Sequence, residues 1–578
     1  MNKALVGVST ATFRGGEMLD LLIRNAVVVD GSGSEPFVID VGVYQGRIVA
    51  LDRTGCAARK TINADGLTLA PGIVDLHTHY DAQVTWDKML SPSPALGVTS
   101  VVMGNCGFGI APNRPPVQDL ILRNLSVVEG MDLEALRCGV DWQFQSFPEY
   151  LDVLRKIGPY LNVAVFAGHS VIRTTVMGEA ASIRNVPTSS ELTEMKNLVA
   201  EAMAGGAVGL SGSYSLNHCG YDGVPMPSTI TELQEFSDLV GTMMKHGGGV
   251  VQIAAGAKTP DQLETISQEH GCAIFQQSPA AMYNERDPDR AVGVYDACVE
   301  AQTRGNQLYT QVACQPVSFD FTLDNAYPFY SHDAFSEVKS FDAKRLKKVF
   351  RDSGFRERFR KSLANPRPGM IFLGNWERVT VAVPARSENR GLAGQTIGEI
   401  SRERGVDPVD VIFDLGLEED LETRFLGEFL NIGDEGVLEL LRHDGGVLTL
   451  SDAGAHLAFM CDAGFGLHFL SKWVHERGDF SLAEGVRRLT SHPAELYGLR
   501  NRGRICEAAH ADLLLFDPAE VGVTAPERVS DLPGGGARMI RRPRGVHGVF
   551  VNGIEVFDGK DYVEHVKGPG HVLDSFDR

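Results

Sequence analysis

The sequence lacks several features that mark common protein classes. Its nine cysteines are few for 578 residues, odd in number and without a Cys-x-x-Cys pair, which argues against the disulfide framework of a secreted protein. No stretch reaches the roughly 18 consecutive apolar residues of a membrane-spanning helix. Basic residues are outnumbered, 54 against 74 acidic, and the net charge of −20 opposes binding to nucleic acid or anionic lipid.

The amino-terminal segment also lacks the apolar core and cleavage site of a secretory leader. We therefore expect a cytoplasmic protein whose partner is a small-molecule substrate, and the sequence leaves open whether it forms a homo-oligomer. Hydrophobic residues make up 43% and charged residues 22% of the chain, close to globular averages. The 63 glycines and 27 prolines are spread along the chain, which suits many short turns between strands and helices.

Short strands are predicted at both ends of the chain. Residues 20–51 contain β-branched runs separated by glycine turns. Residues 511–518 and 547–559 have the same character, the latter with an Asn-Gly hairpin signal. Because the ends of a compact domain commonly lie together, we expect residues 1–70 and 500–578 to form one composite β-domain.

Between these ends, residues 71–499 alternate short apolar runs with helix-length stretches. This alternation predicts parallel β/α units, and eight runs are the number that closes a (β/α)8 TIM barrel of the α/β class. The interval between the last two runs is too long for one loop and predicts an inserted lobe at about 322–445, including a polar helix at 342–363. The eight runs are Ile73–His77, Val98–Met103, Asn162–Ala167, Ala207–Ser211, Gly249–Ala254, Cys272–Gln276, Leu308–Ala313 and Gly446–Ser451.

Two histidines stand at the end of the first run. His77 and His79 are two residues apart, so the alternation of a strand places both imidazoles on one side. Paired neutral imidazoles suit a borderline metal such as Zn²⁺. They fall at the carboxyl end of the first strand, where barrel enzymes carry their sites. Taken alone, the pair is also compatible with two polar residues at a strand end.

Several longer segments carry a recognisable pattern. PGIVDLHTH precedes and includes the histidine pair, β-rich ends flank the predicted barrel, and Ser451-Asp452-Ala-Gly ends the eighth run. Together these resemble the amidohydrolase superfamily. The resemblance extends from about residue 20 to 558. The N-acyl-D-amino-acid deacylase (D-aminoacylase) branch is the most similar, through GVTSVVMGNCGFGIAP (97–112), GHSVIR (168–173), GGAVGLSGSYS (205–215) and TSHPAELYGL (490–499).

This resemblance implies roles for four residues. In the deacylase branch a cysteine after the second strand bridges the metals, and Cys106 matches it. Asp452 matches a carboxylate that ligates the metal and moves protons. The implied metal ligands are thus His77, His79, Cys106 and Asp452, binding a divalent ion, most simply Zn²⁺, at one or two per chain. The plainer alternatives are an inert buried thiol for Cys106 and a local Asx turn at Asp452.

The chain departs from the branch at two strands. Where the branch carries metal-ligating histidines after strands five and six, residues 250–256 and 273–279 contain none. A mononuclear site, a site completed by histidines from other loops, and a chain without catalysis are all compatible with this. The candidate extra ligands or site-lining residues are His169, His218, His456, Gln252 and Gln276. Hydrogen-bonding loop histidines are the alternative for the first three.

Arg173 is the candidate for binding a substrate carboxylate, because a guanidinium binds carboxylates in bidentate geometry. The resemblance implies a metal-dependent amidohydrolase that cleaves the C–N amide bond of an N-acyl (D-)amino acid or related compound. Water activated by the metal would attack the carbonyl, and Asp452 would carry the proton to the departing nitrogen. A cyclic amide or imide hydrolase and a non-catalytic, metal-stabilised binding protein remain as alternatives.

Overall fold

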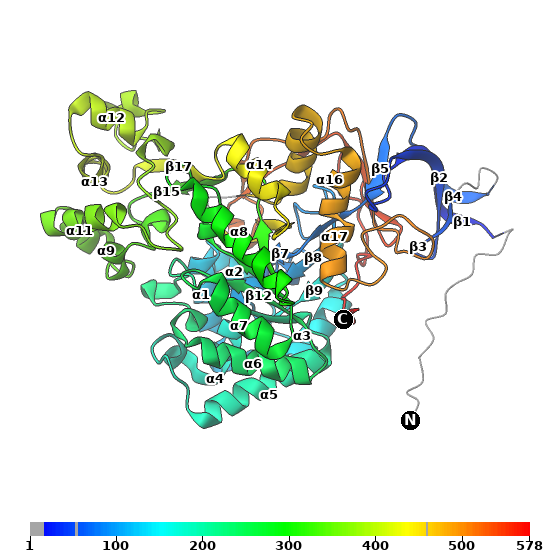
Figure 1. Cartoon of the computed structure of the whole chain (residues 1–578), viewed down its shortest axis with the longest axis horizontal. Coiled ribbons are helices and arrows are strands. Elements are labelled where there is room, and N and C mark those ends of the chain that lie inside the picture. The colour runs from blue at the N-terminus through cyan, green and yellow to red at the C-terminus, as the bar shows by residue number, and fades with distance from the viewer. Residues whose placement is uncertain (1–16, 52–55, 458–460, 578) are drawn as a thin grey trace.

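The computed structural model describes residues 17–51, 56–457 and 461–577. Figure 1 shows a β-sheet at one side of the molecule, a mainly helical lobe at the other, and parallel strands covered by helices between them. Within the described ranges, no helix is both long enough and apolar enough to cross a membrane. All nine cysteines are free thiols.

Strands from both ends of the chain pair in one sheet. They are β1 (Leu19–Val28), β2 (Phe37–Tyr44), β3 (Arg47–Leu51), β4 (Ala58–Asn63), β5 (Thr68–Pro71), β20 (Leu513–Phe516), β25 (Val546–Val551) and β26 (Ile554–Phe557). Their order is β26-β25-β20-β5-β1-β2-β3, with β4 against β1. The antiparallel pair β20–β5 sets Leu513 opposite Pro71 and joins the two ends of the chain. Asn552 and Gly553, with φ of 47° and 77°, turn the β25–β26 hairpin as the Asn-Gly signal predicts.

Short parallel strands form the centre of the molecule. They are β6 (Ile73–Asp75), β7 (His77–Thr78), β8 (Val98–Met103), β9 (Asn162–Val165), β10 (Ala167–Gly168), β11 (Gly209–Ser213), β12 (Val250–Ala254), β13 (Ile274–Gln277), β14 (Leu308–Val312), β18 (Gly446–Leu448) and β19 (Leu450–Ala453). The pairings run β6-β8-β9, then β10-β11-β12-β13-β14-β18, then β19-β7, in three sheets. Each of the eight predicted runs overlaps one of these segments, which confirms the α/β class. The parallel pair β19–β7 brings the last run beside the first.

Helices follow the strands and pack over their outer side. They include α1 (Gln118–Val128), α2 (Leu133–Gly139), α3 (Phe147–Ile157), α4 (His169–Met177), α5 (Ser189–Gly205), α6 (Leu233–Lys245), α7 (Pro260–His270), α8 (Pro288–Thr303), α14 (Asp434–Arg442), α16 (Leu482–Leu489) and α17 (Ser491–Leu496). The start of α5 shows why they form where they do. The Thr188 side chain accepts from the Glu191 N–H, while the Glu191 carboxylate accepts from the Thr188 N–H. This capping box satisfies amide groups that the first helical turn leaves free.

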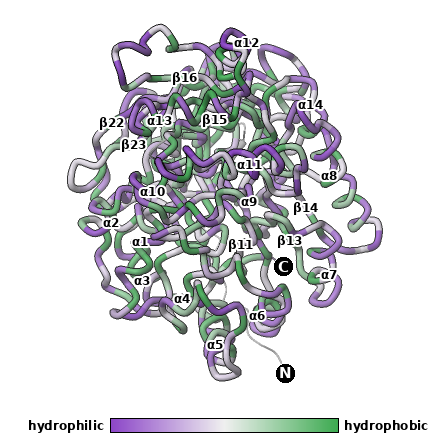
Figure 2. The backbone as a smooth tube through the Cα atoms, turned by 90° about the vertical axis from the view of Figure 1, so that its left-hand side faces the viewer, coloured by the Kyte–Doolittle hydropathy of each residue, from purple (hydrophilic) through white to green (hydrophobic). Residues whose placement is uncertain are grey.

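A separate lobe stands between β14 and β18. Its antiparallel strands β15 (Val317–Phe321), β17 (Arg424–Leu430) and β16 (Val379–Val383) carry α9 (Asp333–Ser336), α10 (Ala343–Phe350), α11 (Ser353–Ala364), α12 (Ile397–Arg404) and α13 (Pro408–Glu418). Figure 2 views this lobe from the front, with the hydrophilic helix α11 drawn below the more hydrophobic strand β15. Its own core is rich in phenylalanine, and rings such as Phe350 and Phe413 stack at 4.9 Å.

The lobe differs from the expectation at three points. Its core begins at Val317 and ends at Leu430 rather than spanning about 322–445, because α14 packs into the central core instead. The single helix predicted at 342–363 is two helices, α10 and α11. The break falls at Asp352, whose carboxylate accepts from the Phe355 N–H and so starts a new helix.

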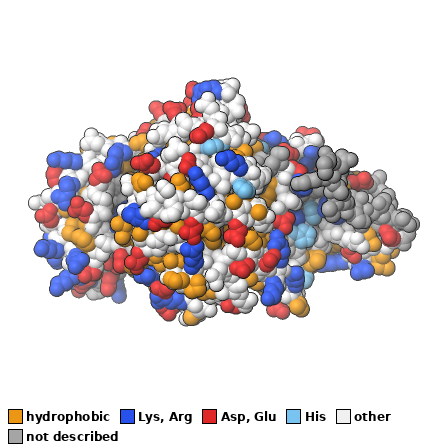
Figure 3. Space-filling model, turned by 90° about the horizontal axis from the view of Figure 1, so that it is seen from below, with side chains coloured by type: hydrophobic (Ala, Val, Ile, Leu, Met, Phe, Trp, Pro, Cys, Tyr) orange, Lys and Arg blue, Asp and Glu red, His pale blue; other side chains and the backbone are white. Residues whose placement is uncertain are grey.

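The exposed surface in Figure 3 carries acidic and basic side chains interspersed with one another. Many of them pair, as Arg137 does with Asp119 and Glu134. On the face shown, this mixture leaves no continuous basic area of the kind that binds a phosphate backbone.

Candidate metal centre and pocket

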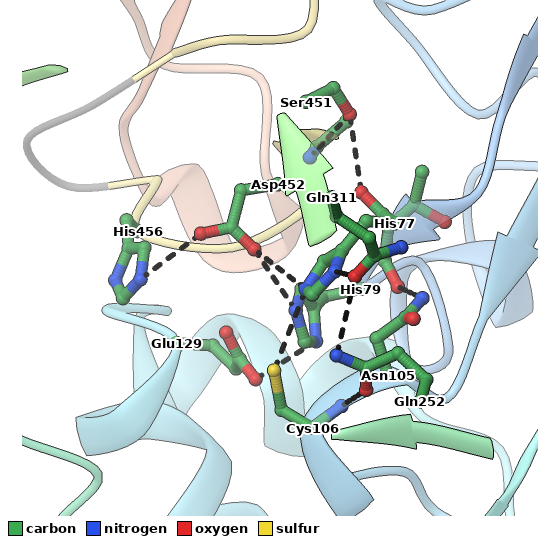
Figure 4. Close-up of polar contacts among 12 residues, drawn as sticks. His77, His79, Asn105, Cys106, Glu129, Gln252, Gln311, Ser451, Asp452 and His456 are labelled. Atoms are coloured by element: carbon green, nitrogen blue, oxygen red, sulfur yellow. Dashed lines mark hydrogen bonds and ion pairs between the residues drawn. The ribbon is translucent and has the colours of Figure 1, made fainter. Parts of the chain in front are cut away.

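The two histidines of the first run meet at the carboxyl end of β7. His77 lies opposite Leu450 of β19, and His79 follows the strand. Their ring centroids are 5.3 Å apart, and both side chains are buried. In Figure 4 both imidazoles turn toward Cys106 and Asp452. The structure thus brings the predicted histidine pair together with the other two implied ligands.

Cys106 stands in a tight turn directly after β8. Its φ of 56° lies in the left-handed region, which few residues other than glycine adopt. Gly107 completes the turn, where a Cβ atom would lie only 3.0 Å from the Cα of Gly212. The Cys106 N–H donates to Gln252 Oε1 at 2.6 Å, and Sγ lies 3.5 Å from His77 Nε2. The turn therefore presents the thiol to the histidines.

Asp452 sits where the β19–β7 pairing is irregular, with a φ of 55°. Its Oδ1 lies 3.1 Å from His79 Nε2, and its Oδ2 lies 3.5 Å from His456 Nε2. Burial opposes ionisation, but the His79 hydrogen bond and the nearby imidazoles outweigh it and hold the pKa of Asp452 well below its usual range. The carboxyl is therefore ionised at neutral pH.

The spacing of these donor atoms fits one divalent ion. The ligand atoms of His77, His79 and Cys106 all lie within 4.8 Å of one another. Asp452 Oδ1 lies 3.6 Å from His77 Nε2 and 3.1 Å from His79 Nε2. A tetrahedral Zn²⁺ with its usual bond lengths sets nitrogen, oxygen and sulfur ligands roughly 3.3 to 3.6 Å apart. The donor set of imidazole, thiolate and carboxylate is also one that Zn²⁺ accepts.

Two further buried side chains orient the histidines, and neither was predicted from the sequence. Gln311 Oε1 lies 2.8 Å from His77 Nδ1, and Glu129 Oε1 lies 3.1 Å from His79 Nδ1. Each acceptor keeps the proton on Nδ1 and turns the Nε2 lone pair toward the centre. Gln311 lies in β14 on the seventh predicted run, whereas Glu129 directly follows α1. No local motif marks either residue, because the contacts exist only once the strands assemble.

Burial sets the protonation of the centre. It lowers the pKa of His77 to about 4 and raises that of Cys106 to about 11. Burial also works against a proton on His79, but the charge of Glu129 and the hydrogen bond with Asp452 outweigh it, so the pKa of His79 lies well above the usual value. A metal ion that binds here must displace protons from Cys106 and His79, which makes binding pH-dependent.

The three other candidate histidines are placed differently. His456 approaches Asp452, and His218 stacks edge-on against Phe108 at 5.2 Å, with Nδ1 2.7 Å from Ser213 Oγ. Burial, together with His456, lowers the pKa of His218 to about 3, so this ring is neutral. His169 does not reach the centre.

The His169 imidazole is instead held at 2.7 Å by Glu235, on α6. The same carboxylate contacts Arg173, the residue expected to bind a substrate carboxylate. Arg173 is fully buried, and its Nε lies 3.0 Å from Glu235 Oε1. Its two terminal nitrogens donate hydrogen bonds to the backbone carbonyls of Ala181, Pro227 and Arg184. The guanidinium is thus held by one ion pair and three backbone carbonyls of the protein, and it ties α4 to its neighbours.

Of the two candidate glutamines, one contacts the centre and the other does not. Gln252 reaches the centre, where it accepts from Cys106 and donates to Gln311 Oε1 at 3.4 Å. Gln276 does not line the site, because its amide turns toward Cys298 of α8, with Nε2 3.3 Å from Sγ. The alternation of a strand places the next residue, Gln277, on the pocket side, and it lines the pocket.

A pocket opens beside the centre between the central strands and the lobe. The space between its lining residues, counted together with the solvent at its open mouth, is about 620 Å³. Asp452 and His456 are among the residues that line it. The polar wall comes from Ser215, Asn217 and His218, and the apolar wall includes Val317, Phe319, Ile371 and Leu430 of the lobe.

The sequence matches the Amidohydrolase family over residues 60–311 and 374–557. An uncharacterized protein of Mycobacterium tuberculosis is 27% identical over 582 residues, covering 94% of this chain and 92% of that protein. A D-aminoacylase of Alcaligenes xylosoxydans xylosoxydans is 26% identical over 548 residues, covering 93% of this chain and 94% of that protein.

Solved structures agree on the fold. A crystal structure of D-aminoacylase superposes with a TM-score of 0.65 at 23% identity, covering 96% of this chain and all 100% of the other. N-acyl-D-glutamate deacylase from Bordetella bronchiseptica, complexed with zinc and a phosphonate inhibitor, gives 0.65 at 21% identity, with 97% and 100% covered. The family match covers most of the chain. This protein is therefore a member of the Amidohydrolase family, related to the D-aminoacylases.

Proposed function

We propose that this chain is a metal-dependent amidohydrolase that cleaves the C–N amide bond of a small N-acyl compound, the class that includes N-acyl (D-)amino acids and related molecules. The observation that carries the proposal is the convergence of His77, His79, Cys106 and Asp452 at strand ends, where Asp452 also lines a pocket. We further propose that the three parallel sheets close into one (β/α)8 barrel, since the β19–β7 pair completes the circuit.

The ligands for a metal are His77 Nε2, His79 Nε2, Cys106 Sγ and Asp452 Oδ1. A Zn²⁺ ion held there would polarise the substrate carbonyl and lower the pKa of an attacking water. Asp452 is ionised, so it can accept a proton from water and pass it to the leaving nitrogen. Gln311 and Glu129 hold the two imidazoles in the tautomer that the ligands need. The lobe wall excludes water from one side of the pocket.

Hydrolysis of a panel of N-acyl compounds tests this proposal, with release of the free amine as the readout. Activity should disappear after dialysis against a chelator and return when Zn²⁺ is added. Ligand binding without any release of amine under metal-replete conditions would instead support a non-catalytic, metal-stabilised binding protein.

A second candidate is hydrolysis of a cyclic amide or imide by the same residues. The observation that favours it is the charge of the pocket, whose described lining contains no lysine or arginine to pair with a carboxylate. Ring substrates run beside linear N-acyl compounds distinguish the two candidates, because ring opening generates a new carboxylate without releasing a separate amine.

A further inference from the structure

The described residues that line the pocket provide no cation for a substrate carboxylate. Its acidic side chains are Asp452, which is ionised, and Asp462, whose pKa burial raises to about 7. Cations that contact lining residues or their neighbours in the chain are held by protein groups, as Arg290 is when its Nη2 donates to Pro279 O at 3.2 Å. Lys339 donates to Leu216 O and Cys219 Sγ, and Arg541 Nε donates to Cys461 O at 2.7 Å. Apart from the proposed metal ion, a substrate carboxylate in this pocket would find no lysine or arginine in the described lining, and it would lie near the ionised Asp452.

Asn217 offers hydrogen bonds to a neutral group of the substrate. It follows β11 in the loop that forms the polar wall and is only 2% exposed. Both its Nδ2 and its Oδ1 are buried and have no hydrogen-bond partner within the described protein. A buried amide with both groups unpaired is unfavourable in the free protein and is explained when a ligand supplies the partners. One donor and one acceptor side by side match another amide.

Apolar side chains of the lobe also line the pocket. Val317 and Phe319 of β15, Leu430 of β17, and Ile371 form a hydrophobic wall. Such a surface favours an aliphatic or aromatic group and gives no compensation for a buried charge.

We propose that the substrate is an uncharged amide: it carries a hydrophobic group against the lobe, presents a second, neutral amide to Asn217, and has no free carboxylate. This deepens the proposed function and rests on it. N-acylated amino-acid amides and cyclic diamides both meet the description, whereas N-acyl amino acids with a free carboxylate do not.

A matched pair of substrates tests the charge. N-acetylleucine and N-acetylleucinamide, each as both enantiomers, differ only in carboxylate against carboxamide, and both release acetate. We expect kcat/KM at least about 100-fold higher for the carboxamide, the scale on which polar sites discriminate. Equal or better hydrolysis of the carboxylate overturns the inference and leaves the proposed function intact.

If neither compound releases acetate, the proposed function fails for this class, and binding decides the inference. Calorimetric titration of the metal-loaded protein with each compound should show tighter binding of the carboxamide. Equal or tighter binding of the carboxylate contradicts the inference in that case as well.

A second arm tests Asn217 itself. Asn217→Leu removes both hydrogen-bonding groups at similar volume, so it should lower kcat/KM for the carboxamide 10- to 100-fold, an order-of-magnitude expectation, without lowering Tm. Asn113→Leu is the matched control. Asn113 is equally buried, but its amide donates to Ile110 O and Phe144 O, so this variant should lower Tm.

The Asn113→Leu variant should also leave the preference between the two compounds unchanged. An Asn217→Leu variant that loses Tm as the control does, yet keeps its kcat/KM in the folded fraction, overturns the assignment of Asn217.

Discussion

Gln311 Oε1 accepts the Nδ1 proton of His77 at 2.8 Å, and this one contact fixes which face of the imidazole is a ligand. Because the amide oxygen needs a donor, Nδ1 keeps its proton and the Nε2 lone pair faces Cys106, 3.5 Å away. Gln252 joins the same chain, since it donates to Gln311 and accepts from the Cys106 N–H. Two neutral glutamines thus couple the orientation of two metal ligands.

Replacing Gln311 should weaken metal binding without removing a ligand. We expect Gln311→Leu to lower Zn²⁺ affinity about 10- to 100-fold, the usual effect of losing a partner of a metal-bound histidine. Competition with a chromogenic chelator measures it. Gln276→Leu is the control, because that amide is also buried on the neighbouring strand but faces Cys298. Equal affinity in both variants would exclude the orienting role.

The metal content of the purified protein tests the ligand set. We expect elemental analysis to find about one ion per chain, because the three clustered side chains and Asp452 fit a single tetrahedral ion. The double substitution His77→Ala, His79→Ala should lose it. About two ions per chain would mean that His218 or His456 completes a second site. No metal under replete conditions would rule out the hydrolytic proposal.

Removing the charge of Asp452 should stop catalysis while the fold persists. We expect Asp452→Asn to reduce kcat by a factor of roughly 10² to 10⁴, the range for loss of a general acid–base group. Stopped assays of amine release at saturating Zn²⁺ give the value. Asp462→Asn is a useful comparison, since Asp462 lines the same pocket but hydrogen-bonds Gln315, so its loss should be smaller. Comparable activity in Asp452→Asn and the parent would remove the proton role.

Arg173 should matter for stability and not for substrate choice. Arg173→Met leaves the Glu235 carboxylate buried without its guanidinium partner, which costs about 3 to 5 kcal/mol. Urea unfolding measures the loss. For Arg137, whose side chain is 41% exposed and pairs in solvent, the same change should lower the stability far less. A fully stable Arg173→Met variant with altered KM would restore the substrate-binding role.

The lobe should lose stability in acid through His332. Its buried ring contacts Ser362 Oγ at 2.8 Å and Phe372 O at 2.9 Å, and burial lowers its pKa to about 4 from 6.5. Between those values the unfolded chain binds the proton and the folded chain does not, so stability falls as pH falls from 6.5 to about 4. The loss amounts to about 3 kcal/mol over this window.

Urea unfolding at a series of pH values tests this expectation. Glutamine does not titrate, so His332→Gln should remove the uptake of one proton on unfolding. The free energy of unfolding of this variant should therefore fall less steeply with decreasing pH than that of the parent. Parallel pH curves for the two proteins would show that His332 does not contribute.

The four candidate ligands of the centre could be predicted from short segments of the sequence. His77 and His79 were predicted as a pair because strand alternation is a local property, and Cys106 and Asp452 followed from their resemblance to family motifs. The structure places all four together. Gln277 lines the pocket and Gln276 faces Cys298 for a local reason as well, because a one-residue shift along a strand reverses the face that a side chain occupies.

The alternation of strands and helices and the histidine motif could be predicted from the residues alone, since each depends on near neighbours or on hydrophobic periodicity. The distant side chains that complete the centre depend on how the chain packs. Glu129 and Gln311 lie 50 and more residues from the histidines they orient, and Arg173 turns away because Glu235 meets it inside the fold. Burial makes these pairings selective: a charge or amide removed from water must find a partner, and only packing determines which one is within reach.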